Sequence, residues 1–262
     1  TDGVDGWVSL EVSPELAYDT ESTVTAAREL HERADRPNVF IKIPGTPEGL
    51  PAIEESIAAG VPVNVTLLFS AEQYVAAAQA YQRGVQRRID AGQNPAVASV
   101  ASVFMSRWDV AVNDRVPAEL KDRLAVAVGQ GIYRAYRELM DSDTSQRLAN
   151  SGGRVQRLLW ASTSTKDPSA PDTLYVHSLA APFTVNTMPD NTLEAFFDHG
   201  EVTGSLPADG GDGDATLAAF ADAGVDVDAV AAKLQSDGAA AFVASWGELM
   251  GRIESKSAVL QA

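Results

Sequence analysis

One lysine lies in the middle of a strongly apolar segment, residues 39–43, and it is the residue best suited to chemistry. Side chains alternate along a β-strand, so if the apolar residues face covering helices, Lys42 points to the opposite face. Burial there penalises the ammonium ion and favours the neutral amine. A neutral amine in a dry pocket is the nucleophile that forms a Schiff base with a carbonyl substrate. The alternative is an edge-strand lysine that faces solvent.

Two further apolar segments carry polar side chains on one face. Glu11 lies inside residues 8–12, where a carboxylate suits general acid/base catalysis. Its structural alternative is an ion pair with Lys42. Asn64 and Thr66 share one face of residues 61–69. The amide can bind a substrate hydroxyl and the threonine hydroxyl can hold a water molecule, although each, taken alone, is more often a satisfied polar group of the core.

Polar residues and cations also gather near the ends of two later apolar segments. Ser102 and Arg107 lie at the end of residues 97–104 and just beyond it, and the guanidinium suits bidentate binding of a phosphate. Ser162 and Lys166 lie at the corresponding end of residues 157–163. An acidic chain that keeps cations at strand ends is expected to use them for an anionic substrate. The alternative is that each cation is an ordinary surface residue.

The segments that carry these residues alternate with helices along the chain. The patterns predict strands over 8–12, 39–43, 61–69, 97–104, 157–163 and 183–187. They predict helices over about 20–34, 50–59 and 70–86, two between 113 and 149, and two amphipathic ones near 226–235 and 238–254. Such alternation implies parallel strands with right-handed crossovers.

The polar residues inside the strands favour a barrel, which gathers inward side chains around one axis. No dinucleotide-binding glycine fingerprint and no phosphate loop follows a strand. The predicted fold is an α/β (β/α)8 TIM-type barrel, with only about six of the eight strands present.

Composition excludes several classes of function. A net charge of −16 argues against nucleic-acid and anionic-membrane binding. The absence of cysteine excludes a disulfide scaffold, a thiolate metal site and a cysteine nucleophile, and three histidines argue against a histidine-rich metal site. No run approaches the roughly 20 apolar residues of a membrane span. We therefore expect a cytoplasmic enzyme with neither a nucleic-acid nor a membrane partner.

At these residues the sequence resembles the transaldolase family over nearly its whole length. The segments that carry the resemblance follow the family's order: Val8-Ser9-Leu10-Glu11-Val12-Ser13-Pro14, Phe40-Ile41-Lys42-Ile43-Pro44, Val63-Asn64-Val65-Thr66-Leu67-Leu68-Phe69-Ser70 and Ser102-Val103-Phe104-Met105-Ser106-Arg107. Trp160-Ala161-Ser162, Lys166-Asp167-Pro168 and Val185-Asn186-Thr187-Met188-Pro189 look like the longer, actinobacterial-type branch of the family.

The resemblance implies a class I Schiff-base mechanism that uses no metal and no organic cofactor. The implied reaction, in the pentose phosphate pathway, moves a dihydroxyacetone unit from sedoheptulose 7-phosphate to glyceraldehyde 3-phosphate. Lys42 would attack the ketose carbonyl. Glu11 and Thr66 would position the water molecule that serves in proton transfers.

The resemblance also implies how these sugar phosphates are bound. Asn64 and Ser102 would bind hydroxyls of the dihydroxyacetone unit. Arg107, Ser162 and Lys166 would bind the phosphate. Two residues after Ser162 the family commonly has an arginine, whereas this chain has a serine.

One departure from the family concerns the start of the barrel. Family members begin with two further strands, which carry an Asp for carbon–carbon cleavage and an Asn at the site, and nothing before Glu11 matches them. We therefore expect an N-terminally truncated single domain over residues 1–262, with a helical insertion near 109–156 and C-terminal helices. If the barrel of this protein has only six strands, the open edges of its sheet must be covered by a partner, a swapped second copy or rearranged helices.

Two other functions fit the same residues. A Schiff-base aldolase acting on fructose 6-phosphate would use the same lysine but release dihydroxyacetone instead of transferring it. A catalytically inactive barrel fragment would serve in binding or assembly, with weak or no transferase activity.

Overall fold

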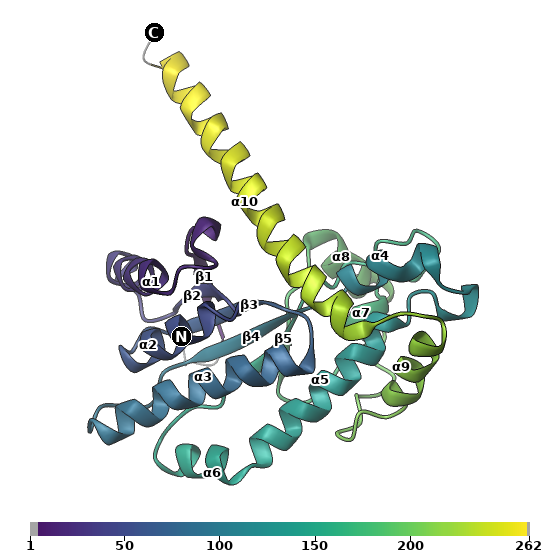
Figure 1. The fold of residues 1–262 in the computed structure, drawn as a ribbon, viewed down its shortest axis with the longest axis horizontal. Helices are drawn as coiled ribbons and strands as arrows, with labels where there is room; N and C mark the ends of the chain where they lie inside the picture. The colour runs from purple at the N-terminus through teal and green to yellow at the C-terminus, as the bar shows by residue number, and fades with distance from the viewer. Residues whose placement is uncertain (1–4, 261–262) are drawn as a thin grey trace.

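The computed structural model describes residues 5–260, which form one six-stranded parallel sheet with the strands in chain order (Figure 1). The strands are β1 (Val8–Glu11), β2 (Val39–Pro44), β3 (Val63–Leu68), β4 (Ser99–Phe104), β5 (Arg157–Ala161) and β6 (Thr184–Asn186). All six predicted strands are confirmed, with ends displaced by at most two residues. The sheet is an open part of a barrel, in agreement with the predicted fold class. The expected domain range of 1–262 extends beyond the described residues at both ends.

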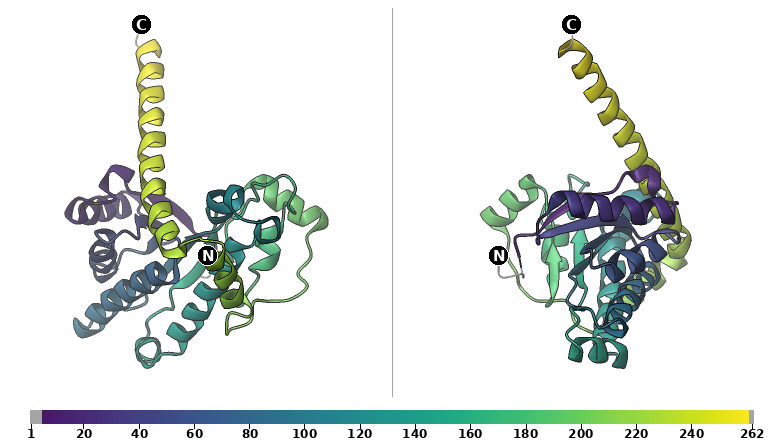
Figure 2. Two further views of the ribbon diagram at one scale, coloured as in Figure 1. Left: turned by 45° about the vertical axis from the view of Figure 1, so that its right-hand side comes forward. Right: turned by 90° about the vertical axis from the view of Figure 1, so that its left-hand side faces the viewer.

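Helices alternate with the strands, and most of them lie on one face of the sheet (Figure 2). They are α1 (Thr20–Ala34), α2 (Gly49–Ala58), α3 (Ala71–Asp90), α4 (Arg107–Val112), α5 (Leu124–Asp141), α6 (Asp143–Asn150), α7 (Leu174–Ser178), α8 (Asp190–His199), α9 (Gly213–Asp222) and α10 (Val227–Leu260). Asp19 caps α1 through Ser22 N, and Ser70 caps α3 in a reciprocal capping box with Gln73. None of the helices within residues 5–260 has both the length and the apolar character of a membrane span.

The two faces of the sheet carry different residues because side chains alternate along each strand. The main core includes Ile41, Val65 and Val103, which pack towards the helices. On the other face a smaller cluster forms around Phe40, Ala98, Val100 and Leu159, with Trp7 stacked on Phe40. Lys42, Asn64 and Ser102 alternate with the main-core residues and therefore share this second face.

The predicted division of the C-terminal region into two helices is wrong. One continuous helix, α10, runs from Val227 to Leu260, and its later part extends away from the sheet (Figures 1 and 2). Gly238 lies inside this helix, where an added Cβ would stand 2.9 Å from Leu67 Cδ2. The glycine therefore permits a close approach of α10 to β3 and does not end a helix.

The prediction that two helices fill residues 113–149 is also wrong in its first part. Residues 113–115 and 118–120 form short 3-10 turns, and regular helix begins only with α5. Pro117 lies between the two turns, where it cannot supply a backbone N–H to an α-helix.

Gly84 of α3 lies where α3 packs against α2, and it provides a test of that packing. An added Cβ would stand 2.7 Å from Ile57 Cβ and 2.8 Å from Glu54 O. We predict that Gly84→Ala lowers the free energy of unfolding by about 1–3 kcal/mol, although alanine favours helix by about 1 kcal/mol. Urea unfolding followed by circular dichroism measures the change.

The matched control is Gly131→Ala in α5, where no atom lies within 4 Å of the added Cβ. In this variant the free energy of unfolding is expected to rise by up to about 1 kcal/mol, from helix propensity alone. Equal changes in the two variants would contradict the close contact at Gly84.

Candidate active site

Lys42 lies at the centre of a row of polar side chains that crosses the first strands. It is in register with Glu11 of β1 on one side and with Asn64 of β3 on the other. Lys42 Nζ is 3.4 Å from Glu11 Oε2, and the two side chains are 23% and 33% exposed. The ion-pair alternative for Glu11 is therefore present in the structure. The edge-strand alternative for Lys42 is wrong, because β2 is paired on both sides.

Asn64 is held by hydrogen bonds from both directions along the same face. Ser102 Oγ donates to Asn64 Oδ1 at 2.7 Å, and Asn64 Nδ2 donates to Ser9 Oγ at 3.0 Å. These bonds fix the orientation of the amide beside Lys42. Ser9 is not among the predicted site residues, although it precedes Glu11 by two positions and alternation therefore places it on the same face.

Thr66 is fully buried, and its Oγ1 has no hydrogen-bond partner within the described part of the chain. It lies in register with Pro44, just before Leu67 adopts a positive φ of 59° and the pairing of β3 with β4 becomes irregular. A buried hydroxyl without a partner costs free energy. Such a hydroxyl is suited to a water molecule or a ligand as its partner.

Arg107 begins α4, directly beyond the carboxyl end of β4. Its Cζ lies 5.4 Å from the Phe104 ring centre and 5.9 Å from that of Phe242 on α10. Burial lowers the pKa of Arg107 from its ordinary value, since the charged form loses hydration. Among residues 5–260, no carboxylate forms an ion pair with this guanidinium. Its donors are therefore available to an anion.

The two other predicted phosphate-binding residues are placed differently. Ser162 follows β5, and its Oγ lies 2.9 Å from that of Ser106, the residue directly before Arg107. Lys166 lies on the exposed loop between β5 and α7 and contacts neither of these residues through a hydrogen bond. The structure therefore brings Ser162 close to the start of α4 and leaves Lys166 outside the group.

Asp109 anchors the helix that carries Arg107, although it is not among the predicted site residues. Its carboxylate accepts hydrogen bonds from Tyr175 Oη at 2.7 Å and from Ala125 N at 3.1 Å, which tie α4 to α7 and α5. Burial raises the pKa of Asp109 to about 6, against the opposing effect of these hydrogen bonds. No local sequence pattern indicates this network, because its members are distant along the chain.

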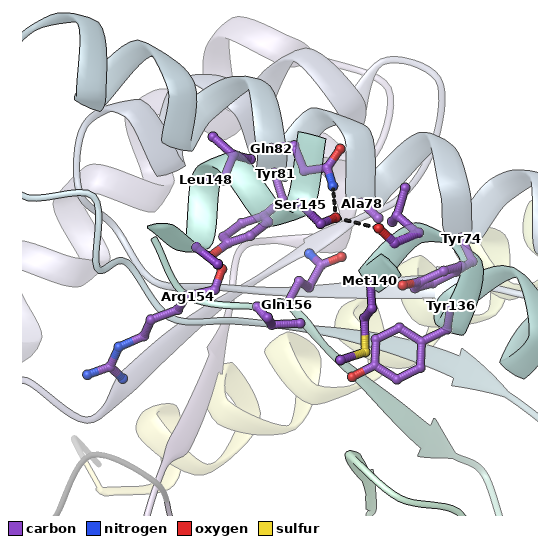
Figure 3. A pocket seen from close by; sticks show the side chains of 13 residues that line it. Tyr74, Ala78, Tyr81, Gln82, Tyr136, Met140, Ser145, Leu148, Arg154 and Gln156 are labelled. Atoms are coloured by element: carbon purple, nitrogen blue, oxygen red, sulfur yellow. Dashed lines mark hydrogen bonds between the residues drawn. The ribbon is translucent and has the colours of Figure 1, made fainter. Parts of the chain in front are cut away.

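Two hollows differ in their relation to the polar row. A cleft of about 250 Å³ opens on the face that carries Asn64 and is lined also by Ser9, Phe40 and Val100. A second cavity, of about 30 Å³, lies among α3, α5 and α6 (Figure 3). That volume holds about one water molecule, so it cannot hold a sugar phosphate. Within residues 5–260, no three His, Asp or Glu side chains are grouped to hold a metal ion.

The chain as a whole is similar in sequence to known proteins. The family model described as Transaldolase/Fructose-6-phosphate aldolase matches residues 2–253. The chain is 50% identical to a transaldolase of Acidothermus cellulolyticus over 261 residues, which are 97% of this chain and 70% of that protein. It is 47% identical to a transaldolase of Thermobifida fusca over 267 residues, 98% of this chain and 73% of that protein.

The raised pKa of Asp109 predicts a pH dependence of stability. Between pH 4 and 6 the folded protein holds a proton that the unfolded chain has lost, so the free energy of unfolding falls as pH rises through this window. The contribution amounts to at most about 3 kcal/mol. Asp109→Asn is expected to flatten this dependence, measured by urea unfolding from pH 4 to 7.

The control is Asp222→Asn, which changes an exposed carboxylate in the last turn of α9. In this variant the free energy of unfolding should change with pH as steeply as in the parent protein. If Asp109→Asn also retains that slope, burial of Asp109 is not its cause.

Proposed function

This chain belongs to the Transaldolase/Fructose-6-phosphate aldolase family, and we propose that it is a transaldolase of the pentose phosphate pathway. The proposed reaction transfers a dihydroxyacetone unit from sedoheptulose 7-phosphate to glyceraldehyde 3-phosphate. The observation that carries the proposal is the row of Glu11, Lys42, Asn64 and Ser102 on one face of four adjacent strands.

We also propose a cytoplasmic location, which the absence of cysteine and hence of disulfides supports.

Lys42 is the proposed nucleophile. After passing one proton to Glu11, Nζ attacks the ketose carbonyl carbon, a carbon–nitrogen bond forms, and the carbonyl oxygen leaves as water to give a protonated imine. Glu11, 3.4 Å from Nζ, is placed to exchange protons with the amine and with the departing hydroxyl. The buried hydroxyl of Thr66, which has no protein partner in the described residues, would hold the water molecule that relays these protons.

Transfer then requires cleavage of the neighbouring carbon–carbon bond. The hydroxyl of the departing fragment would pass its proton to Glu11 through the water molecule held by Thr66, the bond breaks, and its electron pair passes to the imine to give an enamine. The enamine attacks the carbonyl carbon of the acceptor aldehyde, and water finally releases the new ketose from Lys42. Asn64 and Ser102 would hold the hydroxyls of the three-carbon unit, because their own hydrogen bond fixes both groups at the site.

Arg107 is the proposed phosphate-binding residue. It is a partly buried cation without an ion-pair partner among the described residues, and Ser162 lies beside the residue that precedes it. The guanidinium can bind two phosphate oxygens at once. We propose that Lys166, on the loop after β5, adds a second positive charge when substrate is bound.

A Schiff-base aldolase is the second candidate, and the double description of the family favours it as the alternative. Both reactions share the lysine and the enamine and differ in what the enamine reacts with. Incubation with fructose 6-phosphate, with and without erythrose 4-phosphate, distinguishes them. A transaldolase forms sedoheptulose 7-phosphate, whereas an aldolase releases free dihydroxyacetone in either case.

Borohydride reduction tests the nucleophile directly. Dihydroxyacetone and fructose 6-phosphate are each expected to leave a reduced adduct on Lys42, located by peptide mass spectrometry. Lys42→Ala should abolish the adduct because no other amine lies in the polar row, while Lys256→Ala on α10 should retain it. A persistent adduct in Lys42→Ala would refute the assignment, and no adduct in the parent protein would favour an inactive barrel fragment.

The outer strands of the sheet support a further proposal, self-association. β1 and β6 each pair with one neighbour among the described residues. Val8 and Leu10 of β1 are 60% and 41% exposed, and Phe183 beside β6 is 62% exposed. Exposed apolar edge strands favour pairing with another chain. We propose that a second copy covers these edges.

Sedimentation velocity tests this proposal. The parent protein is expected to sediment as a dimer, and Leu10→Lys, which places a charge on β1, should shift it towards the monomer. Leu10 alternates with Glu11 and faces away from the polar row, so Schiff-base trapping should persist in this variant. A monomeric parent protein at micromolar concentration would contradict the proposal.

A further inference from the structure

One face of α10 lies across the carboxyl ends of three strands that carry the polar row. Gln235, Gly238 and Phe242 follow one another at intervals of three and four residues and so share one side of the helix. Gln235 Nε2 lies 3.0 Å from both Gly45 O, after β2, and Leu67 O in β3, and it donates to each. The amide thus ties the helix to the ends of both strands.

The same face reaches Arg107 beyond β4. A Cβ added to Gly238 would stand 3.4 Å from Arg107 Nη1 and 2.9 Å from Leu67 Cδ2, so the glycine lets the helix lie against both. One turn later, the Phe242 ring centre lies 5.9 Å from Arg107 Cζ, while Phe104 lies at 5.4 Å. The guanidinium is therefore placed by two aromatic rings and the backbone of α10.

We propose that α10, through Phe242, positions Arg107 for a phosphate group and so makes the site selective for phosphorylated substrates. The inference rests on the proposed function, which assigns Arg107 to the phosphate. Phe242 is a positioning residue in this scheme, since it acts through Arg107.

Contact with aromatic rings positions a phosphate-binding arginine better than an ion pair does. A carboxylate partner would occupy guanidinium N–H groups and compete with the phosphate. Aromatic rings attract the cation through their faces and leave the five N–H donors free. Arg107 has such ring contacts and no carboxylate partner within residues 5–260. The arrangement fixes the cation and keeps its hydrogen-bonding capacity for the ligand.

The experiment compares a phosphorylated with an unphosphorylated ligand in the same trapping reaction. For Phe242→Leu, which keeps an apolar side chain but loses the ring, the half-saturating concentration of fructose 6-phosphate is expected to rise about tenfold. The half-saturating concentration of dihydroxyacetone, which has no phosphate, should stay unchanged. Phe242→Tyr keeps a ring face and should restore the affinity of the parent protein for fructose 6-phosphate.

Val243→Ala is the matched control, because Val243 is the next residue of α10 and is 39% exposed. It should leave both half-saturating concentrations at the values of the parent protein. Circular dichroism and urea unfolding of each variant confirm that it is folded.

The possible results separate this inference from the proposed function. If the parent protein forms no adduct with either ligand, the proposed function fails. If the parent forms both adducts and Phe242→Leu binds both ligands as the parent does, the positioning role is overturned. An equal loss of affinity for both ligands in Phe242→Leu would also overturn it, since α10 would then support the site as a whole.

Discussion

The Lys42–Glu11 contact is the interaction on which the rest of the site depends. A lysine on the inner face of a central strand needs a partner, because the interior penalises an unpaired charge. The register of β1 with β2 places the carboxylate beside it at 3.4 Å. The same register, continued into β3, brings Asn64 to the other side of Lys42. A slip of one residue in either pairing would turn these side chains to the opposite face.

The two faces of the sheet differ in composition, and the face opposite the helices holds the proposed site. The helix-facing side is a large apolar core that fixes the position of each strand. The opposite side combines a small apolar cluster with the polar row, and Asn64 is held there by Ser9 and Ser102. Thr66 is buried without a hydrogen-bond partner among the described residues, and a polar group in that state costs stability. A buried polar group without a protein partner is expected at a site where a bound ligand supplies the missing hydrogen bond.

Helix α10 connects the outer parts of the site. Backbone carbonyls at the ends of β2 and β3 need donors, and Gln235 supplies both from another part of the chain. The helix then continues past Arg107, where Gly238 allows the approach and Phe242 provides a ring. Asp109 holds α4 from its other end through Tyr175 and Ala125. The position of Arg107 thus depends on contacts from three helices besides its own.

The sequence by itself determined the six strands and the residues of the polar row, because alternation of side chains is a local property that a single apolar segment reveals. Only the tertiary structure decided the continuity of α10 through Gly238, the hydrogen bonds of Asn64 and the surroundings of Arg107. A glycine inside a helix and a glycine that ends one look alike until the neighbouring strand is placed. Gln235 and its acceptor Gly45 O are 190 residues apart. No local pattern encodes such a contact, since it exists only when the folded sheet brings the strand ends beneath the helix.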